Sequence, residues 1–209
     1  MSHLNSPNPP HFIIALNKVD ILTLSGVITS SLAIVAALSG AIYLCTSLLF
    51  IAMLGDALDG MLARKLKLER PFGRYLDGFM DTLIYLVAPT LALYVYGFDG
   101  FWALALWPVL ICGSIRLAVF NDIGNIQESN GLAYLGMPVF WSIFILAGFL
   151  LLEFVLPQGL VYGALAVTLS LFSYAMIIRR PFFKFKKLSH ILFLTIGNSL
   201  LFLILHLSR

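Results

Sequence analysis

The sequence predicts an all-α, polytopic membrane protein: a helical bundle with a six-helix core and about one further transmembrane helix. Three observations lead to this prediction. The chain has 209 residues, of which 60% are hydrophobic and only 11% charged, whereas soluble domains carry about 25% charged residues. Apolar segments of membrane-spanning length repeat along it, and the basic residues gather in the connections that would share one side of a membrane. Too few polar groups remain to cover a water-exposed surface, so the outside must face lipid.

Seven apolar segments are expected to form the helices, because each approaches the ~20 residues that cross a hydrocarbon core. They are 20–39, 41–63, 75–96, 101–120, 137–156, 159–178 and 188–207. Glycine and proline mark several of the breaks, and Asn198 interrupts the last segment, which therefore either joins the core or packs beside it. No signal peptide or soluble domain is evident, so residues 1–209 are expected to form one membrane domain, with 1–18 as its cytoplasmic N-terminal segment.

The basic residues predict the orientation. In an alternating topology all but Arg209 fall on one side, which the positive-inside rule makes cytoplasmic. These twelve are Lys18, Arg64, Lys65, Lys67, Arg70, Arg74, Arg116, Arg179, Arg180, Lys184, Lys186 and Lys187. The stretch PFFKFKK (181–187) is expected to lie on anionic lipid. The expected location is a prokaryotic plasma membrane, with an organelle membrane as the alternative, and nothing indicates nucleic-acid binding.

Four aspartates are the main candidates for chemistry. Asp56 and Asp59 are three residues apart at the end of the second segment, and Asp77 and Asp81 are four apart at the start of the third. Each pair lies on one helical face, and a short hairpin lets the two faces oppose each other. Four converging carboxylates would repel one another unless a divalent cation binds. Oxygen ligands suit Mg²⁺ or Mn²⁺, one or two ions, with Ca²⁺ also possible.

Small residues and an arginine accompany these acids. Gly60, Ala63 and Gly73 leave room beside them, and Arg64 can hold phosphate oxygens with two parallel hydrogen bonds. The pattern indicates a phosphate-handling site at the membrane surface. The alternative is that the aspartates form ion pairs with neighbouring basic residues, an explanation that weakens when four acids occupy two facing helices.

The stretch DALDGMLARKLKLERPFGRYLDGFMD matches D-x2-D-G-x2-A-R-x8-G-x3-D-x3-D at every fixed position. This resembles the signature of the CDP-alcohol phosphotransferases, membrane bundles with a six-helix core that are usually homodimers. The resemblance implies displacement of CMP from a CDP-linked alcohol by a second alcohol. It also implies that Asp56, Asp59 and Asp77 bind metal, and that Asp81 lies near a second metal and acts as general base. Gly60, Ala63, Arg64 and Gly73 would line the CDP pocket.

A weaker resemblance concerns the second half. RLAVFN (116–121), LGMPV (135–139, expected to open the fifth helix) and the basic, aromatic stretch near 181–187 are similar to the phosphatidylserine synthase branch. Val119, Met137 and Gly78 depart from that pattern. The resemblance implies a CDP-diacylglycerol or CDP-archaeol donor and serine as acceptor, with Arg116 and Asn121 binding it. Arg116 would suit the carboxylate of serine, but equally the phosphate of glycerol 3-phosphate or an inositol phosphate. Snorkelling to the headgroups is its alternative role.

Two other classes of function remain open. A divalent-cation transporter would use the four aspartates as a transit site, but it leaves the glycines and Arg64 without a role. A lipid-binding relative without catalytic activity is the other, and the intact motif argues against it.

Overall fold

The computed structural model describes residues 13–124, 126–128, 131–182 and 188–208, and it confirms an all-α membrane bundle. In this described part, six helical stretches are long and apolar enough to cross a membrane. They are Lys18–Leu38, Ile42–Leu66, Pro71–Tyr96, Trp102–Ile123, Gln158–Ile177 and Ser189–Leu207. A shorter apolar helix, Trp141–Leu152, makes the seventh. Each predicted segment therefore contains a helix.

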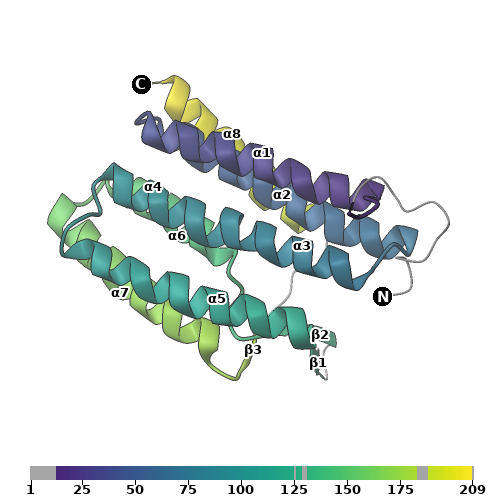
Figure 1. Ribbon diagram of the computed structural model, residues 1–209. Coiled ribbons are helices and arrows are strands. Elements are labelled where there is room, and N and C mark those ends of the chain that lie inside the picture. The colour runs from purple at the N-terminus through teal and green to yellow at the C-terminus, as the bar shows by residue number, and fades with distance from the viewer. Residues whose placement is uncertain (1–12, 125, 129–130, 183–187, 209) are drawn as a thin grey trace.

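The elements follow one another with short connections. In chain order they are α1 (Lys18–Leu38), α2 (Ile42–Leu66), α3 (Pro71–Asp81), the π-helix η1 (Thr82–Val87), α4 (Ala88–Tyr96), the 3₁₀ helix η2 (Trp102–Ala105), α5 (Leu106–Ile123), β1 (Ile126–Glu128), β2 (Gly131–Leu135), α6 (Trp141–Leu152), α7 (Gln158–Ile177), β3 (Pro181–Phe182) and α8 (Leu188–Leu207). Figure 1 shows the start of α1, the α2–α3 connection and the strands at one end of the bundle, and the C-terminus at the other. The basic connections thus share an end, as alternating crossings predict.

The third membrane segment contains a widened turn that the sequence did not reveal. It runs from Pro71 to Tyr96 as α3, η1 and α4, with Pro71 in the first turn, where a missing N–H costs nothing. In a π-helix the hydrogen-bond register is shifted by one residue. The carbonyl of Tyr85 in η1 accepts a hydrogen bond of 2.5 Å from the Ser142 hydroxyl of α6. This bond ties the widened turn to a neighbouring helix.

The prediction that the fifth helix spans 137–156 is wrong in extent. Helix α6 has 12 residues, about 18 Å at 1.5 Å per residue, against a hydrocarbon core of ~30 Å. Before it, the Gly136 N–H donates to the Arg180 carbonyl (2.9 Å) and the Met137 N–H to the Ala175 carbonyl (2.9 Å). Met137 thus pairs with the end of α7 and Gly136 with Arg180 just after it, so no helix begins at LGMPV. Non-helical backbone is tolerated at this depth because it is satisfied by the protein.

A small antiparallel sheet, which the sequence did not predict, joins the two connections at this end. Strand β2 lies between β1 and β3, with Cα pairs that include Ile126 with Ala133 and Tyr134 with Phe182. The sheet therefore fixes the α5–α6 connection against the segment that follows α7. Residues 183–187, most of the basic, aromatic stretch, lie outside the described residues.

The last helix packs against the bundle through α2. The Ser47 hydroxyl donates to the Ser199 carbonyl (2.9 Å), and the two hydroxyls lie 3.0 Å apart. Phe202 is fully buried. Asn198 does not interrupt α8, because its amide donates to the Leu194 carbonyl one turn earlier (2.7 Å).

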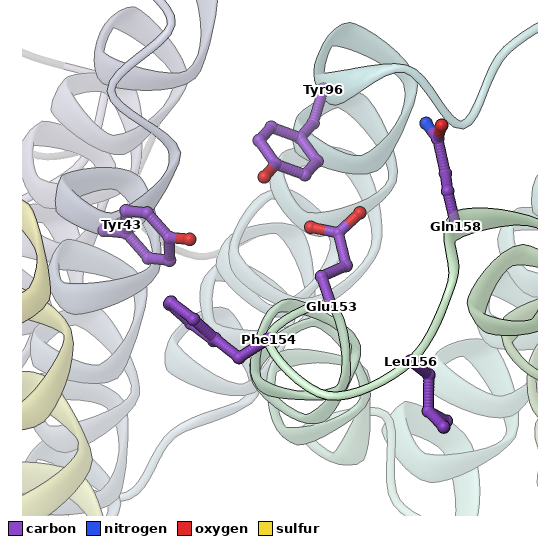
Figure 2. A pocket seen from close by; sticks show the side chains of 6 residues that line it. All are labelled: Tyr43, Tyr96, Glu153, Phe154, Leu156 and Gln158. Atoms are coloured by element: carbon purple, nitrogen blue, oxygen red, sulfur yellow. The ribbon is translucent and has the colours of Figure 1, made fainter.

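A cavity of about 260 Å³ lies at the end of the bundle opposite the strands. It is formed where α4 and α6 end and where α2 and α7 begin. Figure 2 shows the side chains that line it: Tyr43, Tyr96, Glu153, Phe154, Leu156 and Gln158.

Candidate active site

The structure brings the predicted aspartates together at the end of the bundle that carries the basic connections. One carboxylate oxygen from each of Asp56, Asp59 and Asp77 lies within 4.8 Å of the other two. Asp81 is buried beside this group, next to Asp56 and Asp77. The expected opposition of the α2 and α3 faces therefore exists, and three carboxylates form its centre.

Two of these carboxylates have buried oxygens that no described residue satisfies. Asp59 is 2% exposed and Asp81 is 8% exposed, and Oδ2 of Asp59 and Oδ1 of Asp81 lack a hydrogen-bond partner. A buried polar atom without a partner is costly, and such atoms are rare in native structures. A set of converging carboxylate oxygens with free lone pairs fits a hard divalent cation such as Mg²⁺ or Mn²⁺. The residues present thus suit the metal that the sequence implies.

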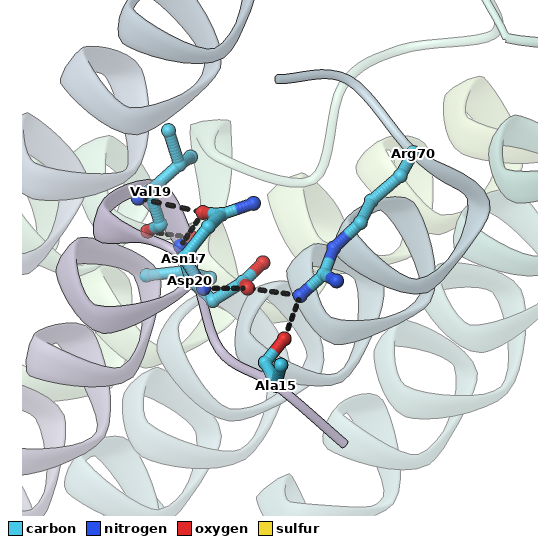
Figure 3. Close-up of polar contacts among 6 residues, drawn as sticks. Ala15, Asn17, Val19, Asp20 and Arg70 are labelled. Atoms are coloured by element: carbon cyan, nitrogen blue, oxygen red, sulfur yellow. Dashed lines mark hydrogen bonds and ion pairs between the residues drawn. The ribbon is translucent and has the colours of Figure 1, made fainter. Parts of the chain in front are cut away.

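The α2–α3 connection is anchored to the start of α1 (Figure 3). The Asn17 side chain accepts hydrogen bonds from the first turn of α1, and the Asn17 N–H donates one to the Asp20 carboxylate (2.7 Å), which completes a capping box. Arg70, the residue before α3, forms an ion pair with Asp20 and donates to the Ala15 carbonyl (3.0 Å). Arg70 entered only the predicted orientation and Asp20 no prediction, although Asn17-x-x-Asp20 is a recognisable capping pattern.

Tyr85 is a site residue that the sequence analysis missed. Its hydroxyl donates a 2.6 Å hydrogen bond to Oδ2 of Asp56, and its side chain is 2% exposed. The π-helix η1 carries this tyrosine, and Ser142 holds its carbonyl. A tyrosine four residues after Asp81 was the available signal, but aromatic residues are common in membrane helices for other reasons.

The glycines of the motif are not required by the protein's own packing. A Cβ added to Gly60 would lie 3.6 Å from Nη1 of Arg64, and one added to Gly73 would lie 3.7 Å from Oδ1 of Asp20, both ordinary contacts. Neither glycine has a positive φ. Arg64 is exposed and Ala63 is half-buried at the same end. Neither close packing nor backbone conformation therefore requires glycine at these two positions.

Gly78 has a different reason for being glycine. A Cβ at this position would overlap the Asn121 side chain of α5. The glycine lets α5 approach α3, and Asn121 fills the space. Oδ1 of Asn121 is buried without a partner among the described residues, so this carbonyl oxygen lies beside the aspartates' helix with an unused lone pair.

Arg116 lies inside the bundle rather than at the headgroups. It is 5% exposed, and its guanidinium carbon lies 5.2 Å from the centre of the Phe120 ring and 5.6 Å from that of Tyr134. Its Nε has no hydrogen-bond partner in the described structure. The snorkelling alternative is therefore wrong for this residue. A buried cation that is held by two rings and retains a free donor fits a site for an anion.

Tyr134 of β2 completes this second polar group and was also missed by the sequence analysis. Burial raises the pKa of Tyr134 to about 12, and the charges of Asp56 and Asp81 contribute to the same shift. The phenol is therefore neutral at physiological pH and can donate a hydrogen bond. Arg116, Asn121 and Tyr134 form a polar wall next to the four aspartates.

Comparisons with known proteins agree with this geometry. Residues 16–178 match the family model described as CDP-alcohol phosphatidyltransferase. The chain is 36% identical over 123 residues to the CDP-diacylglycerol–serine O-phosphatidyltransferase of Bacillus subtilis, covering 56% of this chain and 66% of that protein. It is 32% identical over 130 residues to the enzyme of that name from Methanocaldococcus jannaschii, covering 62% and 61%.

Relatives with another name match as well. The chain is 28% identical over 158 residues to the phosphatidylcholine synthase of Rhizobium meliloti, covering 72% of this chain and 63% of that protein. The chain thus spans slightly less than two thirds of the length of these curated relatives, from 61% to 66%. The family match covers most of the chain and includes both aspartate pairs. The chain therefore belongs to the CDP-alcohol phosphatidyltransferase family.

Proposed function

We propose that this chain transfers a phosphatidyl group from CDP-diacylglycerol, or an archaeol equivalent, to the hydroxyl of L-serine, yielding phosphatidylserine and CMP. The observation that carries the proposal is the group of aspartates with unsatisfied buried oxygens beside the buried cation Arg116. Family membership supports the reaction, and the relatives named for serine support the acceptor.

The aspartates are assigned to the donor side. Asp56, Asp59 and Asp77 would hold Mg²⁺ or Mn²⁺, with Asp81 near a second ion. The bound cation supplies neutralisation of the pyrophosphate and of the charge that develops on it. Arg64 would contact phosphate oxygens, and the small residues Gly60, Ala63 and Gly73 would line the nucleotide pocket.

Asp81 is assigned as the general base. The serine oxygen forms a bond to the phosphorus that carries the lipid, and the bond from that phosphorus to the CMP oxygen breaks. The hydroxyl proton passes to Asp81, whose Oδ1 is buried and has no partner in the described structure. A buried carboxylate oxygen without a partner can take the proton of a hydroxyl that lies within hydrogen-bond reach.

Arg116 and Asn121 are assigned to the acceptor. The guanidinium would bind the serine carboxylate, and the free Asn121 Oδ1 would accept a hydrogen bond from the serine ammonium group. The relatives named for phosphatidylcholine make choline a second candidate. A buried guanidinium disfavours a quaternary ammonium acceptor, because two like charges would share a low-dielectric site.

The site is proposed to face the cytoplasm of a prokaryotic plasma membrane. The support is the shared location of the aspartates and the basic connections at one end of the bundle, combined with the positive-inside rule. A homodimer is proposed from the family resemblance. The lipid tails would enter from the bilayer while the nucleotide remains at the membrane surface.

The test is CMP release by purified protein in detergent with CDP-diacylglycerol and Mg²⁺ or Mn²⁺. Serine, choline, glycerol 3-phosphate and an inositol phosphate are supplied separately. Asp81→Asn should abolish release, whereas Asp99→Asn, at the opposite end of the bundle, should retain it. Release with choline alone, or only with a phosphorylated acceptor, would keep the reaction and reject serine. Absent CMP release together with Mn²⁺ flux into proteoliposomes would instead identify a transporter.

A further inference from the structure

The cavity opposite the aspartates has the composition of a site for a small organic cation. Figure 2 shows the Glu153 carboxylate directed into the space between Tyr96 and Tyr43, with the hydroxyl groups of both tyrosines facing the same space. None of these groups takes part in the proposed reaction. We propose that this cavity binds a primary ammonium group, on a free amine or on the headgroup of a phospholipid.

Charge at this end of the bundle supports a cationic ligand. The connections 39–41, 97–101 and 153–157 contain two charged residues, Asp99 and Glu153, and no lysine or arginine. Two helices end at the cavity and two begin there, so their terminal dipoles largely offset one another. Among the residues that line the cavity, Glu153 is the one with a formal charge, and that charge is negative.

The aromatic side chains supply a second kind of contact. The Tyr43 ring is stacked against Phe154 (6.3 Å between centroids) and Phe202 (6.2 Å), and Figure 2 shows its hydroxyl directed toward the cavity. Tyr96 meets Phe149 edge to face at 6.1 Å. The rings of Tyr96 and Phe154 border the space beside Glu153. Aromatic faces attract ammonium ions, most strongly where water is excluded.

The acceptors select an ammonium that carries N–H bonds. A primary ammonium has three donors, as the lysine head group does, and the carboxylate and two phenol oxygens can accept them. A quaternary ammonium has no N–H bond and therefore cannot donate a hydrogen bond. The volume of about 260 Å³ falls just below the ~300–1,000 Å³ of pockets that hold drug-sized ligands. A headgroup or a small amine fits this volume.

The walls of the cavity are held in place by neighbouring packing. The Gln158 amide donates to the Tyr162 hydroxyl (3.0 Å), and the Tyr162 ring packs against Phe98 at 5.4 Å and Phe149 at 5.8 Å. The site is thus largely formed before a ligand arrives, which lowers the ordering cost of binding.

The experiment measures the thermal stability of the purified chain in detergent as ethylammonium chloride is added. Sodium chloride and tetramethylammonium chloride at equal ionic strength are the comparison salts. Ethylammonium is expected to raise the Tm of the wild type and of Asp99→Asn. Glu153→Gln is expected to bind about tenfold or more weakly, since it loses a charge-assisted hydrogen bond. If that variant does not fold, Tyr96→Leu keeps the carboxylate and should bind several-fold more weakly.

A second measurement identifies the source of the ammonium group. Native mass spectrometry compares retention of phosphatidylethanolamine with that of phosphatidylglycerol. Glu153-dependent retention of phosphatidylethanolamine identifies a lipid headgroup, and a Tm response to ethylammonium without such retention identifies a free amine. The proposal is overturned if ethylammonium has no effect, if either comparison salt acts equally, or if Glu153→Gln responds like the wild type. Failure here leaves the reaction untouched, because CMP release depends on the other end.

Discussion

Removal of the Tyr85 hydroxyl tests whether the π-helix positions Asp56 for metal binding. Tyr85→Phe keeps the ring, which is 2% exposed, and removes the 2.6 Å hydrogen bond to Oδ2 of Asp56. Hydrogen bonds to charged groups contribute about 1.5–3 kcal/mol. At 1.4 kcal/mol per factor of ten, the expected loss of apparent metal affinity is roughly 10- to 100-fold. Loss of a residue that orients a metal ligand has effects of similar size, about 10–100-fold.

The assay is CMP release as a function of Mn²⁺ concentration, with Mn²⁺ binding measured independently by electron paramagnetic resonance. The variant should require more Mn²⁺ for half-maximal rate, and saturating Mn²⁺ should restore the rate to within a few-fold of the wild type. Tyr94→Phe is the matched control, because Tyr94 lies on the same membrane segment and is 51% exposed.

Two results would refute this reasoning. One is a Mn²⁺ titration of Tyr85→Phe that superimposes on that of the wild type in both rate and binding. The other is a lower rate at every Mn²⁺ concentration with unchanged binding, which would place Tyr85 in the chemical step rather than in the orientation of Asp56.

Three further predictions concern other parts of the chain. Gly136→Ala should destabilise the protein by more than about 1 kcal/mol, because φ is +75° and the new Cβ would overlap a backbone carbonyl of α7. Thermal unfolding tests this prediction. The control, Gly148→Ala, should be neutral, because a Cβ at that position meets no other atom within 4 Å. Arg70→Gln should speed hydrogen exchange of the amides at 17–20, and unchanged exchange would argue against the anchor. Since the pKa of Tyr134 is raised to about 12, its phenol stays neutral between pH 7 and 10. Plots of rate against pH for the wild type and for Tyr134→Phe should therefore run parallel over this range. An inflection in this range that the wild type shows and the variant lacks would contradict the prediction.

The sequence predicted the aspartate group because the relevant geometry is local. Spacings of three and four residues place each pair on one helical face. A connection of four residues, 67–70, is so short that the two helices must lie side by side. Membrane helices are also the easiest elements to predict, since the backbone must satisfy itself inside lipid.

The parts that were missed depend on contacts between distant segments. Tyr85 lies in the π-helix and donates to Asp56. Ser142, which donates to the Tyr85 carbonyl, is 57 residues away in the sequence. The strands have 3, 5 and 2 residues, too short for alternation of apolar and polar residues to show. The shortened α6 follows from Gly136 pairing with Arg180, which no local pattern in LGMPV reveals.

The aspartate group and the polar wall are therefore built from different kinds of element. This difference concerns the choice of the acceptor alcohol. The aspartates stand on α2 and α3, joined by a short hairpin. The polar wall, which we propose binds the acceptor, depends on Arg116 of α5 and on Tyr134, whose strand is held by β3 from a separate connection. Connections tolerate change more readily than the helices they join. If relatives keep the aspartate group and differ in the polar wall, this would explain why some are named for serine and others for phosphatidylcholine. Acceptor choice in this chain should accordingly follow Arg116 and its two rings rather than the aspartates.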